Sequence, residues 1–227
     1  MMTFYAAVGR YRIRMEDGHK VPYIQKLGKL NPISIPEFVI WSTLLWEVLS
    51  YDELKKQYDN IIRDSGIHPP ELDELLEMLI RRKLIVRGLG YTGIDALYNM
   101  LADAFVMPYW VSGARKAAVT FRLWLMGKLD FRQFLSQARG VKFGDDENRV
   151  IELVEQTPLS TAEIIRCFDR GIFDVSSPDK IIAGIYPDED SEQIRIANET
   201  RPSNNTNAVL QAVSNLYLNR QIILEVV

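Results

Sequence analysis

Hydrophobic residues recur at helical spacing in three consecutive stretches between Pro36 and Ile80, which predicts three amphipathic helices. The second helix is expected to begin at Tyr51, because Ser50 and Glu53 have the spacing of a capping box. A short apolar run after the third helix predicts a strand. The apolar positions are Val39, Ile40, Trp41, Leu44, Leu45 and Val48 in the first helix, Leu54, Tyr58, Ile61 and Ile62 in the second, Leu72, Leu75, Leu76, Leu79 and Ile80 in the third, and Leu84, Ile85 and Val86 in the strand.

An alternation of apolar and basic residues predicts a β-hairpin between Phe4 and Lys26, with a turn at Asp17-Gly18. The alternating residues are Tyr11, Ile13 and Met15 on one face and Arg10, Arg12 and Arg14 on the other. Alternate residues of a strand lie about 6.6–6.8 Å apart, so the arginines form a row. Such a row suits phosphate groups or an acidic partner, and it also fits an ordinary solvated face.

Residues 93–105 predict a further helix, with Pro108 beyond its end and Ile94, Leu97, Tyr98 and Leu101 on one side. Residues 114–126 and 130–138 predict two connecting helices. The segment 114–142 contains seven Lys and Arg and one acidic residue, so the connector is basic. Because an apolar connecting helix often packs on a second subunit, we expect a homodimer.

The pattern of residues 36–90 returns between residues 145 and 227, which indicates an internal repeat. At an offset of 110, the capping box at Ser50 falls on a second capping box at Ser160. At an offset of 138, the apolar run after the third helix falls on residues 222–224. The two offsets differ by an insertion between the second and third helices of the repeat.

These patterns predict three parts. An N-terminal hairpin with a first unit occupies residues 1–113, a basic helical connector occupies 114–144, and a second unit occupies 145–227. The insertion in the second unit covers residues 171–200 and is predicted as a loop with a strand over 180–186.

Three helices followed by a strand that turns at Gly88 and Gly90 resemble the winged-helix (helix-turn-helix) superfamily. The resemblance covers residues 36–90 and, less cleanly, 145–227. It implies a mainly α fold of α+β class with small β-hairpins or wings, built from two winged-helix-like units. It also implies a non-catalytic DNA-binding transcription regulator whose third helix enters the major groove.

The two third helices differ in their fitness for DNA. The first opens with Glu71, Asp73, Glu74 and Glu77, whose charges oppose phosphates. The second carries amides, which can pair with adenine or form a neutral solvated face. The candidate base-reading residues are Arg201, Asn204, Asn205, Asn207, Gln211 and Asn215, and the candidate phosphate or acidic-partner contacts are Arg10, Arg12, Arg14, Arg81, Arg82, Lys83, Arg115 and Lys116.

The net charge of −3 is unevenly distributed. Residues 1–140 contain 19 Lys and Arg against 15 Asp and Glu, whereas residues 141–227 contain 8 against 15. A polyanion is therefore expected to contact the first part. Alternatively, the basic connector pairs with the acidic second part.

A second resemblance covers residues 4–90. A hairpin, an Asn31-Pro32 element, three helices and a terminal strand are similar to the PqqD-like domains that hold leader peptides. This resemblance implies that a peptide adds as a strand beside the hairpin and packs on the third helix. The arginine row would then meet an acidic peptide, and the protein would be a peptide- or protein-binding adaptor.

The composition argues against several other classes. Cys167, His19 and His68 are too few for a cysteine–histidine metal site, so we expect no metal. Neither a phosphate-binding glycine loop nor a nucleophile elbow is present, so we expect no catalysis and no cofactor. The longest apolar run, residues 104–111, is too short for a bilayer. Without a signal-peptide pattern, we expect a cytoplasmic protein that does not enter membranes.

Overall fold

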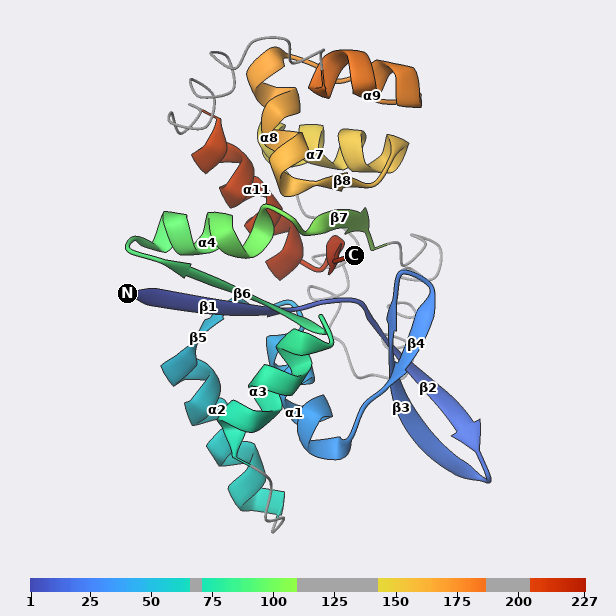
Figure 1. Cartoon of the computed structure of the whole chain (residues 1–227), viewed down its shortest axis with the longest axis vertical. Coiled ribbons are helices and arrows are strands. Elements are labelled where there is room, and N and C mark those ends of the chain that lie inside the picture. Colours follow the sequence, from blue (N-terminus) through green and yellow to red (C-terminus); the bar gives the residue numbers. More distant parts are fainter. Residues whose placement is uncertain (66–70, 110–142, 187–204) are drawn as a thin grey trace, which may run out of the picture.

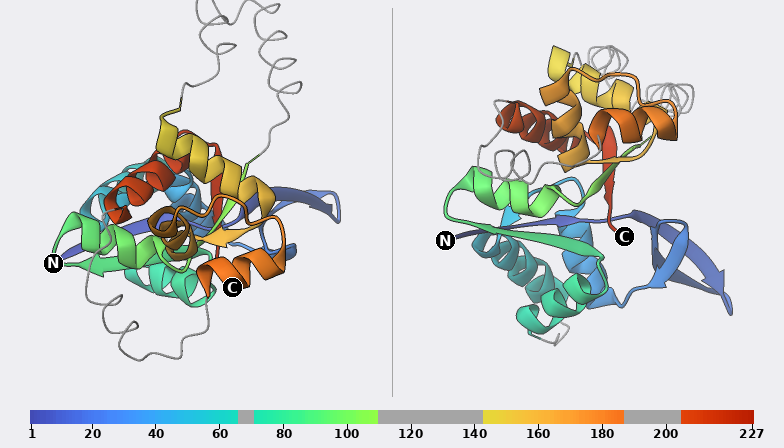
Figure 2. Two further views of the ribbon diagram at one scale, coloured as in Figure 1. Left: turned by 90° about the horizontal axis from the view of Figure 1, so that it is seen from above. Right: turned by 45° about the horizontal axis from the view of Figure 1, so that its top comes forward.

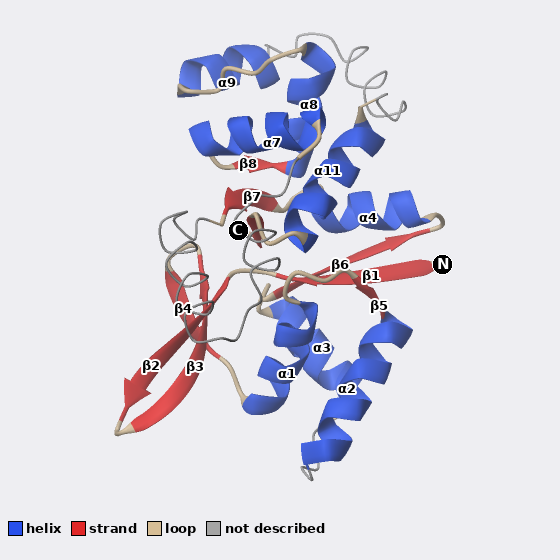
Figure 3. Ribbon diagram, turned by 180° about the vertical axis from the view of Figure 1, so that it is seen from behind, coloured by secondary structure: helices blue, strands red, loops and turns tan. Residues whose placement is uncertain are grey.

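The computed structural model describes residues 1–65, 71–109, 143–186 and 205–227. The described chain is an α+β protein in which helices pack on small antiparallel sheets (Figures 1 and 3). Within these ranges no helix is both long and apolar enough to cross a membrane.

The N-terminal part contains the elements β1 (Met2–Ala7), β2 (Arg10–Glu16), β3 (His19–Lys26), β4 (Lys29–Pro32), α1 (Ile35–Leu44), β5 (Leu49–Ser50), α2 (Tyr51–Ser65), α3 (Leu72–Arg81), β6 (Ile85–Gly90) and α4 (Gly93–Leu101). The remaining described elements are β7 (Phe105–Pro108), α7 (Asp145–Gln156), β8 (Leu159–Ser160), α8 (Thr161–Arg170), α9 (Pro178–Ile185), α11 (Thr206–Leu218) and β9 (Ile222–Glu225).

The β5-β1-β6 sheet and the β8-β7-β9 sheet have the same arrangement. In each sheet the strand that comes first in the chain lies in the middle. Phe4 of β1 pairs with Ser50, and Phe105 of β7 pairs with Ser160. Equivalent strands therefore occupy equivalent positions in the two sheets. A third sheet, β2-β3-β4, stands apart from both.

Capping boxes start four of the described helices, including α4, where Thr92 and Asp95 form the box. The boxes predicted at Ser50 and Ser160 are confirmed, because each serine hydroxyl accepts a hydrogen bond from the backbone amide three residues later. A third box joins Ser34 to Glu37 and starts α1 one residue before Pro36. Helix α1 ends at Leu44, so Leu45 and Val48, which the sequence pattern assigned to this helix, lie beyond its end.

Strand β1 separates two hydrophobic cores. Tyr5 and Ala7 face the core formed with α1, α2 and α3, whereas Ala6 faces the core shared by α4, α7, α8 and α11. Successive residues of a strand point to opposite faces, so one strand contributes to both cores. Figure 1 shows α4 and α11 on one side of β1 and β6, with α1, α2 and α3 on the other.

Helix α4 packs unusually close to β6. A Cβ atom at Gly88 would lie 2.0 Å from the backbone oxygen of Ala96 and 2.6 Å from Met100. Glycine is therefore required for this approach. The contact buries Ala96, Met100 and Leu101, whereas Ile94 and Tyr98 of the predicted apolar side are exposed.

The helix predicted over residues 93–105 is too long. It ends at Leu101, and Phe105–Pro108 forms β7, which pairs with β8 and β9. A run of four apolar residues does not distinguish strand from helix by periodicity, which explains the error. The predicted boundary of the first part at residue 113 therefore separates β7 from β8 and β9, the two strands with which it pairs.

The N-terminal hairpin also differs from the prediction. The turn at Asp17-Gly18 is confirmed by φ angles of 48° and 80°, but β1 belongs to another sheet and β4 extends the hairpin to three strands. The second turn, Leu27-Gly28, has the same left-handed backbone.

The turn between α3 and β6 has the same backbone geometry as the turn between α11 and β9, and Lys83 in the first turn matches Arg220 in the second. These two residues are 137 positions apart, so the predicted offset of 138 is wrong. Lys83 and Arg220 both have positive φ, and the next amide in each case donates to the carbonyl five residues earlier at 2.9 Å. All four residues of β9 are buried, so the strand lacks the alternation that would fix its register.

The strand predicted over residues 180–186 is a helix, α9. Ser177 caps its first turn by accepting from Lys180 N, and Pro178 occupies a position where its fixed φ favours a helix. Helix α9 packs on α8, where Arg170 donates to the carbonyl of Gly184 at 2.6 Å.

Candidate functional site

The three strands β2, β3 and β4 form a twisted ribbon that projects from the body of the protein (Figures 1 and 3). Both of its turns have two residues with positive φ, the geometry that matches the twist of antiparallel strands. This ribbon comprises residues 10–32.

The base of the ribbon is anchored from two directions. Tyr11 contacts the ring of Phe38 with 4.9 Å between ring centroids, and Ile24 is fully buried in the core around α1. In the second turn, the Leu27 amide donates to Glu225 Oε2 at 3.0 Å. The ribbon is therefore held by α1 on one side and by β9 on the other.

Beyond this base, the apolar face of β2 becomes progressively more exposed. The exposed fraction rises from 38% at Tyr11 to 52% at Ile13 and 64% at Met15. A strand that alternates so clearly normally buries its apolar face. No described residue covers the outer part of this face.

The opposite face of β2 carries the arginine row that the sequence predicts. Arg12 donates from Nε to Gln25 Oε1 of β3 at 2.9 Å, and Arg10 lies over the ring of Tyr109 at 5.9 Å. Arg14 is exposed, with no hydrogen bond or ion pair to any described residue. Arg12 and Arg14 thus present positive charge to solvent.

The backbone of β2 pairs with no described strand along its outer edge. The residues that flank a two-residue turn form a hydrogen-bonded pair, and such pairs alternate along antiparallel strands. The N–H and C=O groups of Tyr11, Ile13 and Met15 therefore point away from β3. Strand β2 is outermost in its sheet, and these groups have no partner among the described residues.

The outer edge of β4 offers much less. By the same alternation, only Leu30 and Pro32 face outward on this four-residue strand. Pro32 has no N–H group, and its carbonyl accepts from Arg82 Nη2. The edge of β2 is therefore the better template for a new strand.

Basic residues gather around Glu225 at the base of the ribbon. Burial raises the pKa of Glu225, although the Leu27 amide and the charges of Arg10 and Lys26 act in the opposite direction. Burial also lowers the pKa of Lys26, and the neighbouring charge of Lys83 lowers it further. Lys83 itself donates to a backbone oxygen of Val227.

The remaining residues that were predicted to contact phosphate lie outside the ribbon. Arg82 forms an ion pair with the buried Glu37 at 2.6 Å, so its charge is used inside the protein. Arg81 is exposed at the end of α3. Arg115 and Lys116 lie outside the described residues.

The predicted base-reading residues on α11 are only partly accessible. Asn207 and Gln211 are exposed. Asn205 donates to Asp169 at 2.9 Å, and Asn215 donates to Glu147 at 3.0 Å, so both amides are hydrogen-bonded to carboxylates. Arg201 and Asn204 lie outside the described residues. The buried residues of this helix are Val209, Leu210, Ala212, Val213, Leu216 and Tyr217.

The amide residues and the arginine row do not form one surface. Helix α11 and the ribbon lie on opposite sides of the molecule in all views (Figures 1 and 2). Sequence reasoning missed this separation, because the burial of α11 depends on contacts with α4 and with β1 that are distant in the chain. It also missed β4, although Gly28 between the apolar residues Ile24 and Leu30 could have indicated a second turn.

Comparison with known proteins adds no further constraint. The chain matches no protein-family model, no curated protein and no solved structure. In the part of the chain that the structure describes, no group of three or more His, Cys, Asp or Glu side chains is placed to hold a metal ion.

Proposed function

We propose that this protein is a non-catalytic adaptor that binds an extended segment of another protein or peptide as an additional strand along β2. The observation that carries the proposal is the outer edge of β2, which pairs with no described residue and is flanked by an exposed apolar face and an exposed arginine face. Addition of a strand to a free sheet edge is a common mode of peptide recognition.

Backbone pairing supplies affinity in this mode. Tyr11, Ile13 and Met15 together offer three donors and three acceptors to an antiparallel strand. Each hydrogen bond contributes about 0.5–1.5 kcal/mol net. The sum is enough for reversible binding after the cost of ordering the peptide is subtracted.

The two faces of β2 define the partner's sequence. Side chains directly opposite one another on paired strands interact, and opposite charges are favourable. A matching segment alternates apolar residues, which extend the Ile13 and Met15 face, with Asp or Glu beside Arg12 and Arg14. The partner is therefore an acidic and amphipathic extended segment.

A second copy of β2 does not meet this requirement. In the antiparallel register that pairs Tyr11, Ile13 and Met15 of one copy with the same three residues of the other, Arg12 lies opposite Arg14 of the second copy. Like charges directly opposite destabilise a sheet. The homodimer expected from the sequence would therefore use a different surface, such as the connector, which lies outside the described residues.

The proposed scaffold is a pair of winged-helix-like units. The shared strand order of the β5-β1-β6 and β8-β7-β9 sheets and the repeated capping boxes support this interpretation. The order of the ribbon followed by α1, α2 and α3 supports the resemblance to PqqD-like domains. We place the peptide on β2 and not on β4, because Pro32 and Arg82 occupy the β4 edge.

A DNA-binding transcription regulator is the second candidate. The outer part of the ribbon, where β2 pairs with β3 beyond the end of β4, has two strands. A two-stranded ribbon fits the major groove, and Arg12 and Arg14 could contact phosphates there. Asn207 and Gln211 are exposed and capable of base contacts. This candidate ranks below the adaptor, because the amides and the arginines lie on opposite sides of the molecule.

Selection from a displayed library of random peptides, long enough to pair with β2, tests the proposal. We expect enrichment of peptides that alternate acidic and apolar residues. Ile13→Pro removes one outward N–H and leaves the β3 bonds intact, because proline is tolerated where an edge N–H faces solvent. It should abolish binding, whereas the control Ile13→Ala should weaken it less.

Two results would count against the adaptor. Selected peptides that bind Ile13→Pro as tightly as the unaltered protein would exclude strand addition at β2. Retention of particular genomic DNA fragments, with affinity falling steeply as salt rises and lost in Asn207→Ala or Gln211→Ala, would favour the regulator instead.

A further inference from the structure

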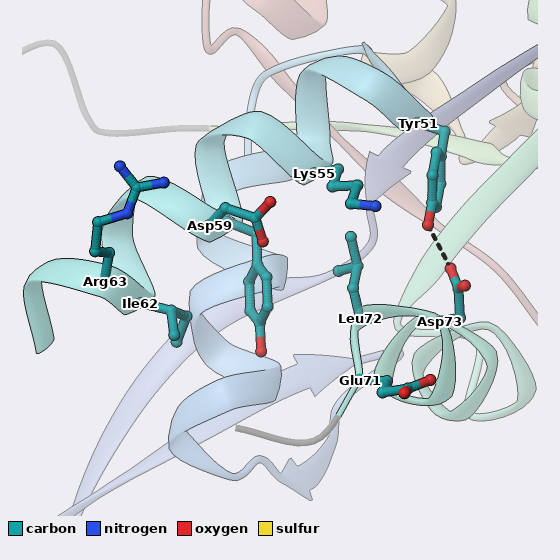
Figure 4. Close-up of a pocket in the computed structure, with 9 residues that line it drawn as sticks. Tyr51, Lys55, Asp59, Ile62, Arg63, Glu71, Leu72 and Asp73 are labelled. Atoms are coloured by element: carbon teal, nitrogen blue, oxygen red, sulfur yellow. Dashed lines mark hydrogen bonds between the residues drawn. The ribbon is translucent and has the colours of Figure 1, made fainter. Parts of the chain in front are cut away.

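A hollow of about 580 Å³ lies between α2 and α3, and no residue of the ribbon lines it (Figure 4). In Figure 4, Lys55 and Asp59 of α2 lie opposite Leu72 of α3. Asp73 closes one end by accepting a hydrogen bond from the Tyr51 hydroxyl at 2.8 Å. This bond raises the pKa of Tyr51 to about 12.

The floor of the hollow contains an unsatisfied polar group. Tyr58 is only 3% exposed, and its buried hydroxyl has no hydrogen-bond partner among the described residues. Leaving a buried hydroxyl unpaired costs about 1–3 kcal/mol, so such groups are rare in folded proteins. Leu72 provides an apolar wall beside it. The floor therefore suits a ligand with an apolar body and one polar atom for the Tyr58 hydroxyl.

The rim carries unpaired charges of both signs. Lys55 and Arg63 supply positive charge, and Asp59 and Glu71 supply negative charge. All four side chains are exposed, and none forms an ion pair with a described residue. A ligand that carries both an ammonium and a carboxylate complements such a rim.

The second half of the chain shows that the fold does not require this polar lining. At the offset of 110, Lys55 corresponds to Ile165, which is 6% exposed. At the offset of 137, Asp73 corresponds to Leu210, which is 2% exposed. Both polar positions are thus apolar and buried in the equivalent helices α8 and α11. The open polar hollow is a specific property of α2 and α3.

We propose that this hollow binds a small zwitterion of the amino-acid type, a free apolar amino acid or an apolar dipeptide. Its carboxylate lies beside Lys55, its ammonium lies beside Asp59, and its side chain packs on Leu72. The Tyr58 hydroxyl supplies a hydrogen bond from below. The volume falls within the range of small-molecule sites, about 300–1,000 Å³.

Calorimetric titration of the full chain with free amino acids and with leucyl-leucine tests the proposal. We expect saturable binding of at least one apolar zwitterion, and no binding of N-acetyl-leucine amide, which has the same side chain but no charges. Tyr58→Phe should weaken binding about tenfold through the lost hydrogen bond. Lys55→Ala should weaken it similarly, and the control Lys56→Ala, exposed on the same helix but outside the hollow, should not.

Tyr58→Phe also separates binding from folding. Without ligand, this change removes an unsatisfied hydroxyl and should leave thermal stability unchanged or raised. Equal binding by Tyr58→Phe and the unaltered protein, equal binding of the uncharged leucine derivative, or no binding at millimolar ligand would overturn the proposal. Ile13→Pro should not affect this site, so the hollow and the ribbon can fail independently.

Discussion

The backbone amide of Leu27 donates to Glu225 Oε2 at 3.0 Å, and this bond joins the ribbon to the strand β9 near the other end of the sequence. Glu225 is 6% exposed, and the residues between these two groups include most of both cores. The position of the ribbon is therefore set by elements that follow it by almost 200 residues.

Glu225→Gln should change how stability depends on pH. Burial raises the pKa of Glu225 in the folded state, so the folded protein favours the protonated acid, and stability falls as pH rises through that pKa. Glutamine keeps an acceptor for Leu27 without ionising. At pH values below the ordinary pKa of glutamate, we expect the variant and the unaltered protein to have the same melting temperature. At pH values above the raised pKa of Glu225, the variant should have the higher melting temperature. Glu155→Gln, on the exposed surface of α7, should show no such divergence.

Arg82→Ala should reduce stability in a manner that disappears in acid. Burial alone would raise the pKa of Glu37, but hydrogen bonds from Ser34 and the Arg82 charge lower it overall. Because the pKa of Glu37 is lower in the folded than in the unfolded protein, the ionised carboxylate stabilises the fold at pH values above its unfolded-state pKa. This stabilisation is lost as the pH falls through the folded-state pKa. We expect a loss of about 1–2 kcal/mol in urea unfolding at pH 7, shrinking below pH 4. An equal loss in Arg81→Ala, the exposed neighbour, would contradict a role for the ion pair.

Gly88→Ala should destabilise the packing of α4 on β6. The added Cβ would lie 2.0 Å from the backbone oxygen of Ala96, which cannot move without displacing the helix. We expect a loss of about 2–3 kcal/mol in thermal or chemical unfolding. Gly93→Ala is the matched control, because its Cβ would meet its nearest neighbour at 3.8 Å. A similar loss in both variants would mean that close approach is not the cause.

Tyr217→Phe should weaken the contact between α11 and the N-terminal part. The hydroxyl lies 3.0 Å from the carbonyl oxygen of Leu44 and 3.1 Å from that of Ala7. Its removal leaves buried carbonyls without this donor, at a cost of about 1–2 kcal/mol. Urea unfolding measures the loss, and Tyr98→Phe, at an exposed position of α4, should change stability little.

Local sequence patterns were sufficient for much of the secondary structure. The starts of α2 and α8 follow from the capping boxes at Ser50 and Ser160, because a capping box uses only groups within four residues. The turn at Asp17-Gly18 follows for the same reason, since left-handed backbone is accessible to these residues. The arginine row on β2 was also predictable, because side chains alternate along any strand.

The assignment of strands to sheets required the tertiary structure. Strand β1 adjoins the ribbon in sequence but pairs with β5 and β6, and β7 pairs across more than 100 residues with β9. Backbone hydrogen bonds between strands are the same for any sequence, so only side-chain packing selects the partner. For β9 even the register was ambiguous, because all its residues are buried.

The candidate sites depended on the fold in the same way. The sequence placed arginines on one face of β2, but it did not show that no described strand pairs with the outer edge of β2 or that α11 is buried in the core with α4, α7 and α8. Similarly, Tyr58 fits a helical apolar stripe, and only the arrangement of α2 and α3 leaves its hydroxyl unsatisfied beside a hollow. Sequence by itself determined the local elements, because their hydrogen bonds close within a few residues. Tertiary structure decided which surfaces remain exposed, because exposure depends on contacts between residues distant in the chain.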